Sequence, residues 1–138
     1  MNTKTTQYKS RYLGAATVEA AVVLPLLLLL TFGVIEYGWL FLKAHQITNA
    51  ARHGSRIAVR PSATNAQVMG SISDLMSSAE ITGYQVTISP GDISLVSVGE
   101  TVEVGITVPW ENVAIMNIPL LPKPTNIQAS VTMAKEGP

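Results

Sequence analysis

The chain has 138 residues, of which 47% are hydrophobic and 13% charged, and its formal net charge is zero. This length is enough for one domain and not two, and the absence of cysteine excludes disulfides and thiolate metal sites. The charges are unevenly distributed along the chain. Residues up to Arg60 include seven Lys or Arg and two carboxylates, a net charge of +5, whereas residues from Pro61 onward include two Lys and seven carboxylates, a net charge of −5. A nucleic-acid-binding domain needs a basic face, so the acidic second half argues against nucleic acid as a partner.

The first predicted element is a helix of membrane length that follows a short basic leader, residues 1–14. From Ala20 to Leu42 the chain has 23 residues with Glu36 as the only charge. At about 1.5 Å per residue they form a helix of about 34 Å, which is enough to cross a bilayer. We therefore predict a single transmembrane helix at residues 15–43. The short and wholly basic leader favours a cytoplasmic N-terminus and an exported C-terminal half.

Three interpretations of this segment compete. A cleaved secretory signal fits the basic leader, but Glu19 stands at the start of the apolar run and residues 35–41 make a poor exit site. An uncleaved anchor needs no special chemistry. In the third interpretation the chain is cut after Gly14. The new amino group then lies on Ala15 and can neutralise Glu19, on the same chain or a neighbouring one; an unpaired carboxylate there is costly.

Two further residues of the apolar helix are candidate contacts between subunits. Pro25 leaves the carbonyl of Ala21 without its helical donor, and in a membrane a neighbour or a kink must satisfy that group. Glu36 precedes an aromatic belt at residues 37–41. It can reach headgroups or water there, or it can form a specific pair with another subunit.

We expect the same helix to continue to about Val59, with two different faces. One face is a narrow stripe of small and apolar residues that lets another backbone approach closely, and Ala51 and Gly54 are its candidate contacts. The approaching backbone can belong to the chain's own domain or to a neighbour. A second stripe is polar and basic, and we expect it to face solvent. Alternatively, it can contact anionic headgroups or an acidic neighbouring domain. Its residues are His45, Asn49, Arg52, Arg56 and Arg60.

A second helix is predicted after the first one ends at Arg60-Pro61, because the residue before proline is pushed out of the helical region. Ser62 or Thr64 can cap it, and we expect Gly83 to end it. Its apolar residues fall on one helical face: Val68, Ile72, Leu75, Met76 and Ala79.

Beyond Gly83 the apolar period changes to two. Residues 84–89, 101–108 and 127–134 alternate apolar and polar side chains, with no helix between them, which predicts an antiparallel meander with one buried face. Residues 93–98 are a weaker, fourth strand. The Pro-containing loop 110–125 can cover the sheet edge or expose a contact patch, through Ile115, Met116, Ile118, Leu120 and Leu121.

These elements together predict an α+β fold. A long N-terminal helix, transmembrane and then amphipathic, precedes a second helix and a meander of three or four strands. Residues 44–138 are expected to form the extracytoplasmic domain, helical over 44–82 and a sheet over 84–135.

No residue pattern typical of catalysis is present. His45 and His53 are eight positions apart, unlike the i, i+4 pair that binds zinc on a helix, and no glycine-rich phosphate loop occurs. No Gly-x-Ser-x-Gly elbow exists either. We therefore expect no enzymatic activity, no cofactor, no metal and no small-molecule substrate.

Four segments of the chain resemble the TadE-like family, the pilin-like proteins of tight-adherence (Flp-type) pilus systems. They are Gly14-Ala15-Ala16-Thr17-Val18-Glu19, Leu24-Pro25-Leu26-Leu27-Leu28, Phe32-Gly33-Val34-Ile35-Glu36-Tyr37-Gly38, and Thr48-Asn49-Ala50-Ala51-Arg52-His53-Gly54-Ser55-Arg56. The rest of the chain matches only in outline.

The resemblance implies a pilin-like protein of the bacterial inner membrane or of the pilus itself. It implies that a prepilin peptidase cuts after Gly14 and that Glu19 is the acidic fifth residue of the product. The product is then a minor pilin or an assembly component, with other pilin subunits and pilus assembly proteins as partners. The alternative is an uncleaved single-span protein whose acidic extracytoplasmic domain binds a partner.

Overall fold

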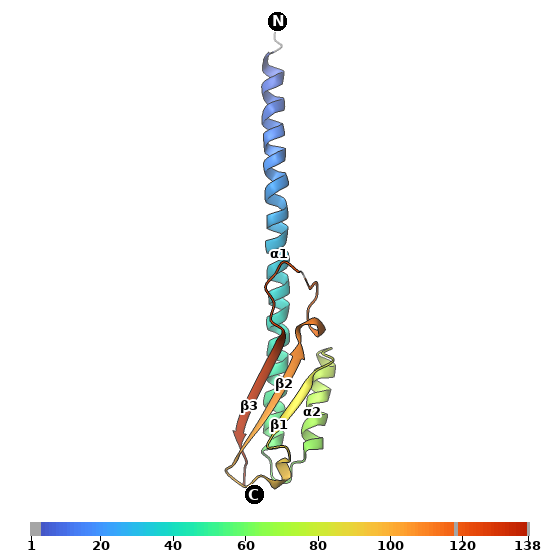
Figure 1. Cartoon of the computed structure of the whole chain (residues 1–138), viewed down its shortest axis with the longest axis vertical. Coiled ribbons are helices and arrows are strands. Elements are labelled where there is room, and N and C mark those ends of the chain that lie inside the picture. The colour runs from blue at the N-terminus through green and yellow to red at the C-terminus, as the bar shows by residue number, and fades with distance from the viewer. Residues whose placement is uncertain (1–3, 118, 138) are drawn as a thin grey trace. The chain divides into compact units, whose positions relative to one another are not determined.

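The computed structural model describes residues 4–117 and 119–137, and for residues 4–13 it describes the backbone alone. The chain divides into two compact units, Met1–Tyr37 and Gly38–Pro138. The elements in chain order (Figure 1) are α1 (Lys4–Ala58), α2 (Asn65–Ser78), β1 (Gln85–Ser89), the short 3-10 helix η1 (Ile93–Leu95), β2 (Thr101–Pro109), a second 3-10 helix η2 (Trp110–Asn112) and β3 (Asn126–Ala134). The α+β composition predicted from the sequence is therefore confirmed.

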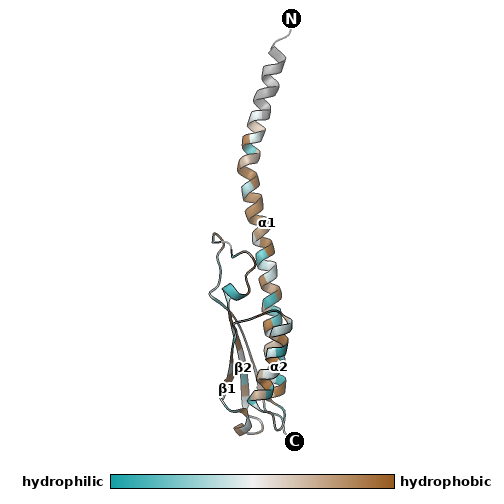
Figure 2. Ribbon diagram, turned by 90° about the vertical axis from the view of Figure 1, so that its right-hand side faces the viewer, coloured by the Kyte–Doolittle hydropathy of each residue, from teal (hydrophilic) through white to brown (hydrophobic). Residues whose placement is uncertain are grey.

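The first unit is the N-terminal part of α1, and it carries no charged residue from Ala20 to Ile35. Figure 2 shows this part of the helix mostly in the colours of hydrophobic residues. Among the described residues one stretch is long and apolar enough to cross a membrane, within Gly14–Ala58, with a mean hydropathy of 2.5. The hydroxyl of Thr31 donates to the carbonyl of Leu27 at 2.8 Å, so this polar group is satisfied inside the helix.

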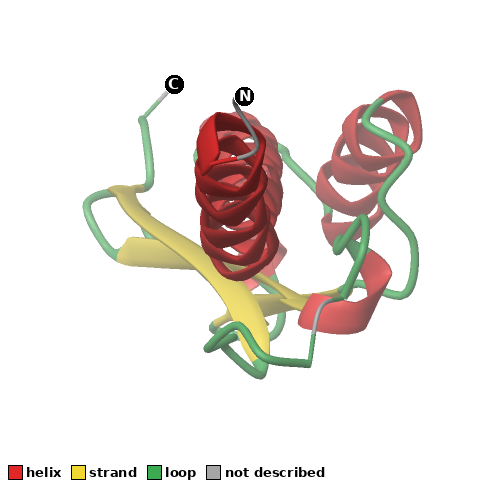
Figure 3. Cartoon of the chain, turned by 90° about the horizontal axis from the view of Figure 1, so that it is seen from above, coloured by secondary structure: helices red, strands yellow, loops and turns green. Residues whose placement is uncertain are grey.

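The second unit contains a three-stranded sheet with helices on one face. The strand order is β1-β2-β3 and both pairs are antiparallel, so the predicted meander is confirmed. Figure 3 shows that α2 and α1 lie on the same side of the sheet. The side chains of β2 alternate between buried and more exposed positions, and the buried ones are at most 1% exposed: Val102, Val104, Ile106 and Val108.

The core of this unit lies between the buried face of the sheet and the two helices. It includes Ile47 and Ala51 from α1, and Val68, Ile72 and Met76 from α2, all 0% exposed. Burying each large aliphatic side chain contributes about 1.5–3 kcal/mol. The helical spacing of these residues in the sequence predicted this face correctly.

The start of α2 agrees with the sequence, but its end does not. Thr64 is the N-cap and forms a capping box with Gln67, as the sequence allowed. The helix ends at Ser78, well before Gly83. Glu80 has φ = 54°, and its N–H donates to the carbonyl of Ser77 while that of Ile81 donates to Met76. These two bonds form a Schellman motif, in which Glu80 holds the left-handed position where a glycine was expected.

The fourth strand predicted at residues 93–98 is wrong. The segment Ile93–Leu95 forms η1 instead. Asp92 accepts hydrogen bonds from the N–H of Ser94 at 3.0 Å and from its hydroxyl at 2.6 Å. These bonds from Ser94 lower the pKa of the Asp92 carboxyl. A local carboxylate cap of this kind offers the backbone an alternative to the sheet ladder.

Candidate functional site

The residues of the expected processing region lie on α1 and are exposed. Gly14, Ala15 and Glu19 all belong to this exposed stretch of the helix. A Cβ atom added at Gly14 would meet no neighbour within 4 Å, so none of the described side chains covers this position. Ala15 and Glu19 are four residues apart, a separation of about 6 Å along the helix axis. Glycine in a helix interior costs about 1 kcal/mol relative to alanine, so α1 is locally weakened at this position.

The two candidate contacts within the apolar stretch have different surroundings. Pro25 lies inside α1 and is exposed, so its surface is open to a neighbouring helix. Glu36 is also on α1, but its side chain is buried. Their roles as contacts between subunits stay predictions.

The small-residue stripe of α1 packs inside the chain's own domain. Ala51 is 0% exposed. A Cβ atom added at Gly54 would lie 2.7 Å from Cδ1 of Ile72 and 3.5 Å from Cγ1 of Val104. Real Cβ atoms do not come this close, so Gly54 is what lets α1 approach α2 and β2. The sequence left open whether this stripe packs against the chain's own domain or against a neighbouring subunit, and in the structure it packs against the chain's own domain.

The polar and basic stripe of α1 faces outward. All five of its residues are exposed: His45, Asn49, Arg52, Arg56 and Arg60. Within the second unit this face is therefore available to solvent, to anionic headgroups or to an acidic neighbour.

Two buried lysines donate hydrogen bonds to carbonyls at the C-terminal ends of the two helices. Neither of these contacts was predicted from the sequence. The ammonium of Lys43 donates to the carbonyl of Ala79, the C-cap of α2, at 2.5 Å and lies 4.6 Å from the ring centre of Trp39. The ammonium of Lys135 donates to the carbonyls of Ala58 and Ile93, both at 3.2 Å. Ala58 is the last residue of α1. A cation is favourable at the C-terminal end of a helix, where carbonyls lack donors.

Three apolar side chains of the loop 110–125 are exposed. Ile115 and Leu120 are 51% and 75% exposed, and Met116 is 38% exposed. Ile118, a further member of the expected patch, lies outside the described residues. Of the two interpretations of this loop, an exposed surface agrees better with these exposed fractions than a cover for the sheet edge.

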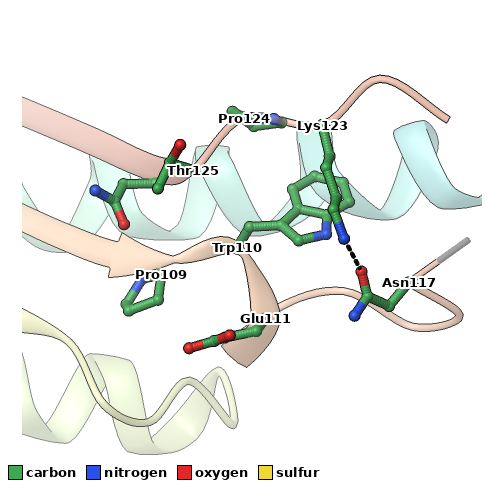
Figure 4. A pocket seen from close by; sticks show the side chains of 8 residues that line it. Pro109, Trp110, Glu111, Asn117, Lys123, Pro124 and Thr125 are labelled. Carbon is green, nitrogen blue, oxygen red and sulfur yellow. Dashed lines mark hydrogen bonds between the residues drawn. The ribbon is translucent and has the colours of Figure 1, made fainter. Parts of the chain in front are cut away.

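A pocket of about 500 Å³ lies between the two arms of this loop (Figure 4). The backbone N–H of Trp110 donates to the carbonyl of Thr125 at 3.0 Å and holds the arms together at the sheet. The ammonium of Lys123 donates to Oδ1 of Asn117 at 2.7 Å and joins them again further out. Nothing in the sequence pattern predicted this pocket, because it depends on how the two arms fold back on each other.

No group of three or more His, Cys, Asp or Glu residues placed to hold a metal ion occurs in the part of the chain that the structure describes. The polar clusters of the second unit that are visible in this part, around Lys43, Lys135 and Asp92, consist of caps on the ends of helices and turns.

Comparison with known proteins identifies the N-terminal part of the chain. The family described as TadE-like protein matches residues 14–56. No curated protein and no solved structure matches the chain. The matched range contains the expected processing residues Gly14, Ala15 and Glu19 and the candidate contacts Pro25, Glu36, Ala51 and Gly54. Residues 14–56 are therefore TadE-like, as their sequence motifs predicted.

Proposed function

We propose that this protein is a pilin-like minor subunit or assembly component of a tight-adherence (Flp-type) pilus, and that a prepilin peptidase processes it. One observation carries the proposal: an exposed carboxylate, Glu19, stands directly before the uncharged apolar stretch of α1, five positions after Gly14. The TadE-like match begins at Gly14, which supports a cut at that residue.

The apolar helix would hold the subunit in the bacterial inner membrane before assembly. Large aliphatic side chains are exposed around its whole circumference in the first unit, and a helix of this kind needs lipid or protein around it. The leader would remain in the cytoplasm and residues 44–138 would be exported. Extraction into a filament would replace lipid contacts by contacts between helices.

Glu19 would then set the axial alignment of neighbouring subunits. Cleavage after Gly14 creates a free ammonium group on Ala15, and a neighbour's ammonium can pair with Glu19 once lipid is left behind. A buried pair contributes little net stability, but an unpaired buried charge costs about 3–5 kcal/mol. An axial alignment of subunits that leaves Glu19 unpaired would therefore be less stable by that amount than the alignment that pairs it. This role is structural, and we propose no enzymatic activity for the chain.

The mass of the mature N-terminus tests the processing step. The chain is purified from membranes of its native host, in which the peptidase is present, and its N-terminal peptide is identified by mass spectrometry. A product that starts at Ala15 supports the proposal. Recovery of the intact leader, residues 1–14, contradicts it. Gly38→Leu is a control for Gly14→Leu, because both glycines have no neighbour within 4 Å of an added Cβ; only Gly14→Leu should block the cut.

One observation favours the alternative, an uncleaved membrane anchor. The described helix α1 begins at Lys4 and passes through Gly14 without a break, so no change in backbone structure separates the leader from the rest. The extracytoplasmic domain would then act while tethered to the membrane. The same mass measurement separates the two functions.

A further inference from the structure

The pocket in the loop 110–125 contains a buried hydrogen-bond donor without an acceptor. Trp110 is 7% exposed, and its indole Nε1 is one of the buried polar atoms that lack a partner within the described part of the chain. A buried donor left without an acceptor costs about 1–3 kcal/mol. Such groups are rare in folded proteins, and a bound water, ion or ligand group is one explanation for them.

The other tryptophan of the chain shows that this situation is particular to the pocket. The indole Nε1 of Trp39 donates to the carbonyl of Val113 at 2.9 Å. Trp39 is therefore satisfied by the backbone of the same loop that leaves Trp110 unsatisfied. The two indoles provide an internal comparison.

A positive charge lines the same pocket as the unsatisfied donor. Lys123 and Trp110 both belong to the lining, and Figure 4 shows the Lys123 side chain crossing the Trp110 ring in this view, with its ammonium directed toward Asn117. Lys123 donates one hydrogen bond to Asn117, and its ammonium group carries three donors in all. The pocket also contains a carboxylate, Glu111, but its side chain points to the opposite side in this view.

The remaining wall combines apolar and small polar groups. Pro109 and Pro124 form apolar parts of the lining, and Thr125 and Asn126 add polar side chains. Two N–H donors in one pocket, one of them charged, suit the two oxygens of a carboxylate. The prolines match a short carbon skeleton attached to it.

We propose that this pocket binds a carboxylate, through Nε1 of Trp110 and Nζ of Lys123. The carboxylate can belong to a free small acid or to an acidic residue of a peptide, since the chemistry of the bond is the same. This inference does not depend on the pilin-like role, because it concerns only the second unit of the chain.

The test uses the full chain, labelled with nitrogen-15, in detergent micelles. N-acetylglutamate is the probe for a free acid, and a five-residue peptide with one central glutamate and blocked ends is the probe for a peptide. The indole N–H resonances of the two tryptophans are followed by NMR during each titration and are assigned with Trp110→Phe.

The expected result is a saturable shift of the Trp110 indole proton to lower field while the Trp39 indole resonance stays in place. The Lys123→Gln variant should bind about tenfold more weakly, the effect of losing one charge-assisted hydrogen bond. Lys123 is exposed, so this variant leaves the fold intact. Arg60→Gln removes an exposed charge from outside the pocket lining and should bind like the unmodified chain.

Saturation by the free acid, by the peptide or by both supports the site and identifies the source of the carboxylate. Three results would overturn it. They are no shift with either probe, an equal response to the neutral N-acetylglutaminamide, which has no carboxylate, and equal binding of inorganic phosphate, which would indicate a general anion site.

Discussion

The ammonium group of Lys43 on α1 donates a 2.5 Å hydrogen bond to the carbonyl of Ala79, the residue that caps the C-terminal end of α2. Lys43 is 6% exposed. The bond joins two residues that are 36 positions apart in the chain, and it places a positive charge at the negative end of a helix. The contribution of this hydrogen bond to the free energy of unfolding can be measured by substitution.

We expect Lys43→Met to lower the free energy of unfolding of the second unit by about 1–3 kcal/mol. Methionine keeps the length of the side chain but leaves the Ala79 carbonyl without its charged donor. Thermal unfolding in detergent, followed by near-ultraviolet circular dichroism, measures the loss. Arg52→Met, on the exposed face of the same helix, should change stability by less than about 0.5 kcal/mol. Equal effects of the two variants would contradict the assignment.

The close approach at Gly54 leads to a second prediction. Gly54→Val should destabilise the second unit by about 1–3 kcal/mol, because the added atoms overlap with the side chain of Ile72. Ile72→Ala is destabilising by itself, but the two changes together should cost less than the sum of their separate costs, because the atoms added at Gly54 occupy the space that Ile72 leaves. The matched control is Gly38→Ala, where an added Cβ meets nothing within 4 Å. A Gly54→Val variant as stable as the parent chain would show that the helices are not in contact there.

Asp92 predicts a specific pH dependence. The hydrogen bonds from Ser94 lower the pKa of its carboxyl in the folded chain below the ordinary value of 3.8. A lowered pKa contributes stability above the ordinary value, and that contribution disappears as the pH falls through the folded-state pKa. The difference in melting temperature between the parent chain and Asp92→Asn should therefore be constant near neutral pH and shrink below about pH 4. A difference in melting temperature that grows as the pH is lowered would contradict a lowered pKa of Asp92.

The proposed role of Glu19 predicts a selective defect in assembly. Glu19→Ala should leave cleavage and membrane insertion unchanged and abolish incorporation into the pilus, because no carboxylate remains to meet the neighbour's ammonium. Immunoblots of sheared pili and of membranes measure the two pools. Glu111→Ala, an exposed carboxylate of the second unit, serves as the control. Normal incorporation of Glu19→Ala would remove the argument for register control.

Features with a local cause could be predicted from the sequence. Alternation along residues 101–108 predicted the central strand, and its buried positions were assigned correctly. The Thr64 cap depends on a residue three positions away and was foreseen for the same reason. The apolar helix followed from composition alone.

Features that depend on distant partners could not be predicted. The left-handed position at the end of α2 is held by Glu80, although glycine is the residue that usually favours it. The buried lysines looked like surface charges, because Ala79 and Ala58, whose carbonyls they bind, are 36 and 77 positions away. The pocket beside Trp110 is formed by both arms of the loop 110–125, and this loop has no periodic sequence pattern from which its conformation could be predicted.

The end of the domain is joined to the end of its first helix. The N–H of Glu136 donates to the carbonyl of Val59 at 2.9 Å, and the hydroxyl of Ser55 donates to the carbonyl of Val131 at 3.1 Å. During synthesis α1 leaves the ribosome well before these residues do. Part of its apolar face therefore stays uncovered until the final strand has been synthesised, so the domain closes only when its last strand is in place.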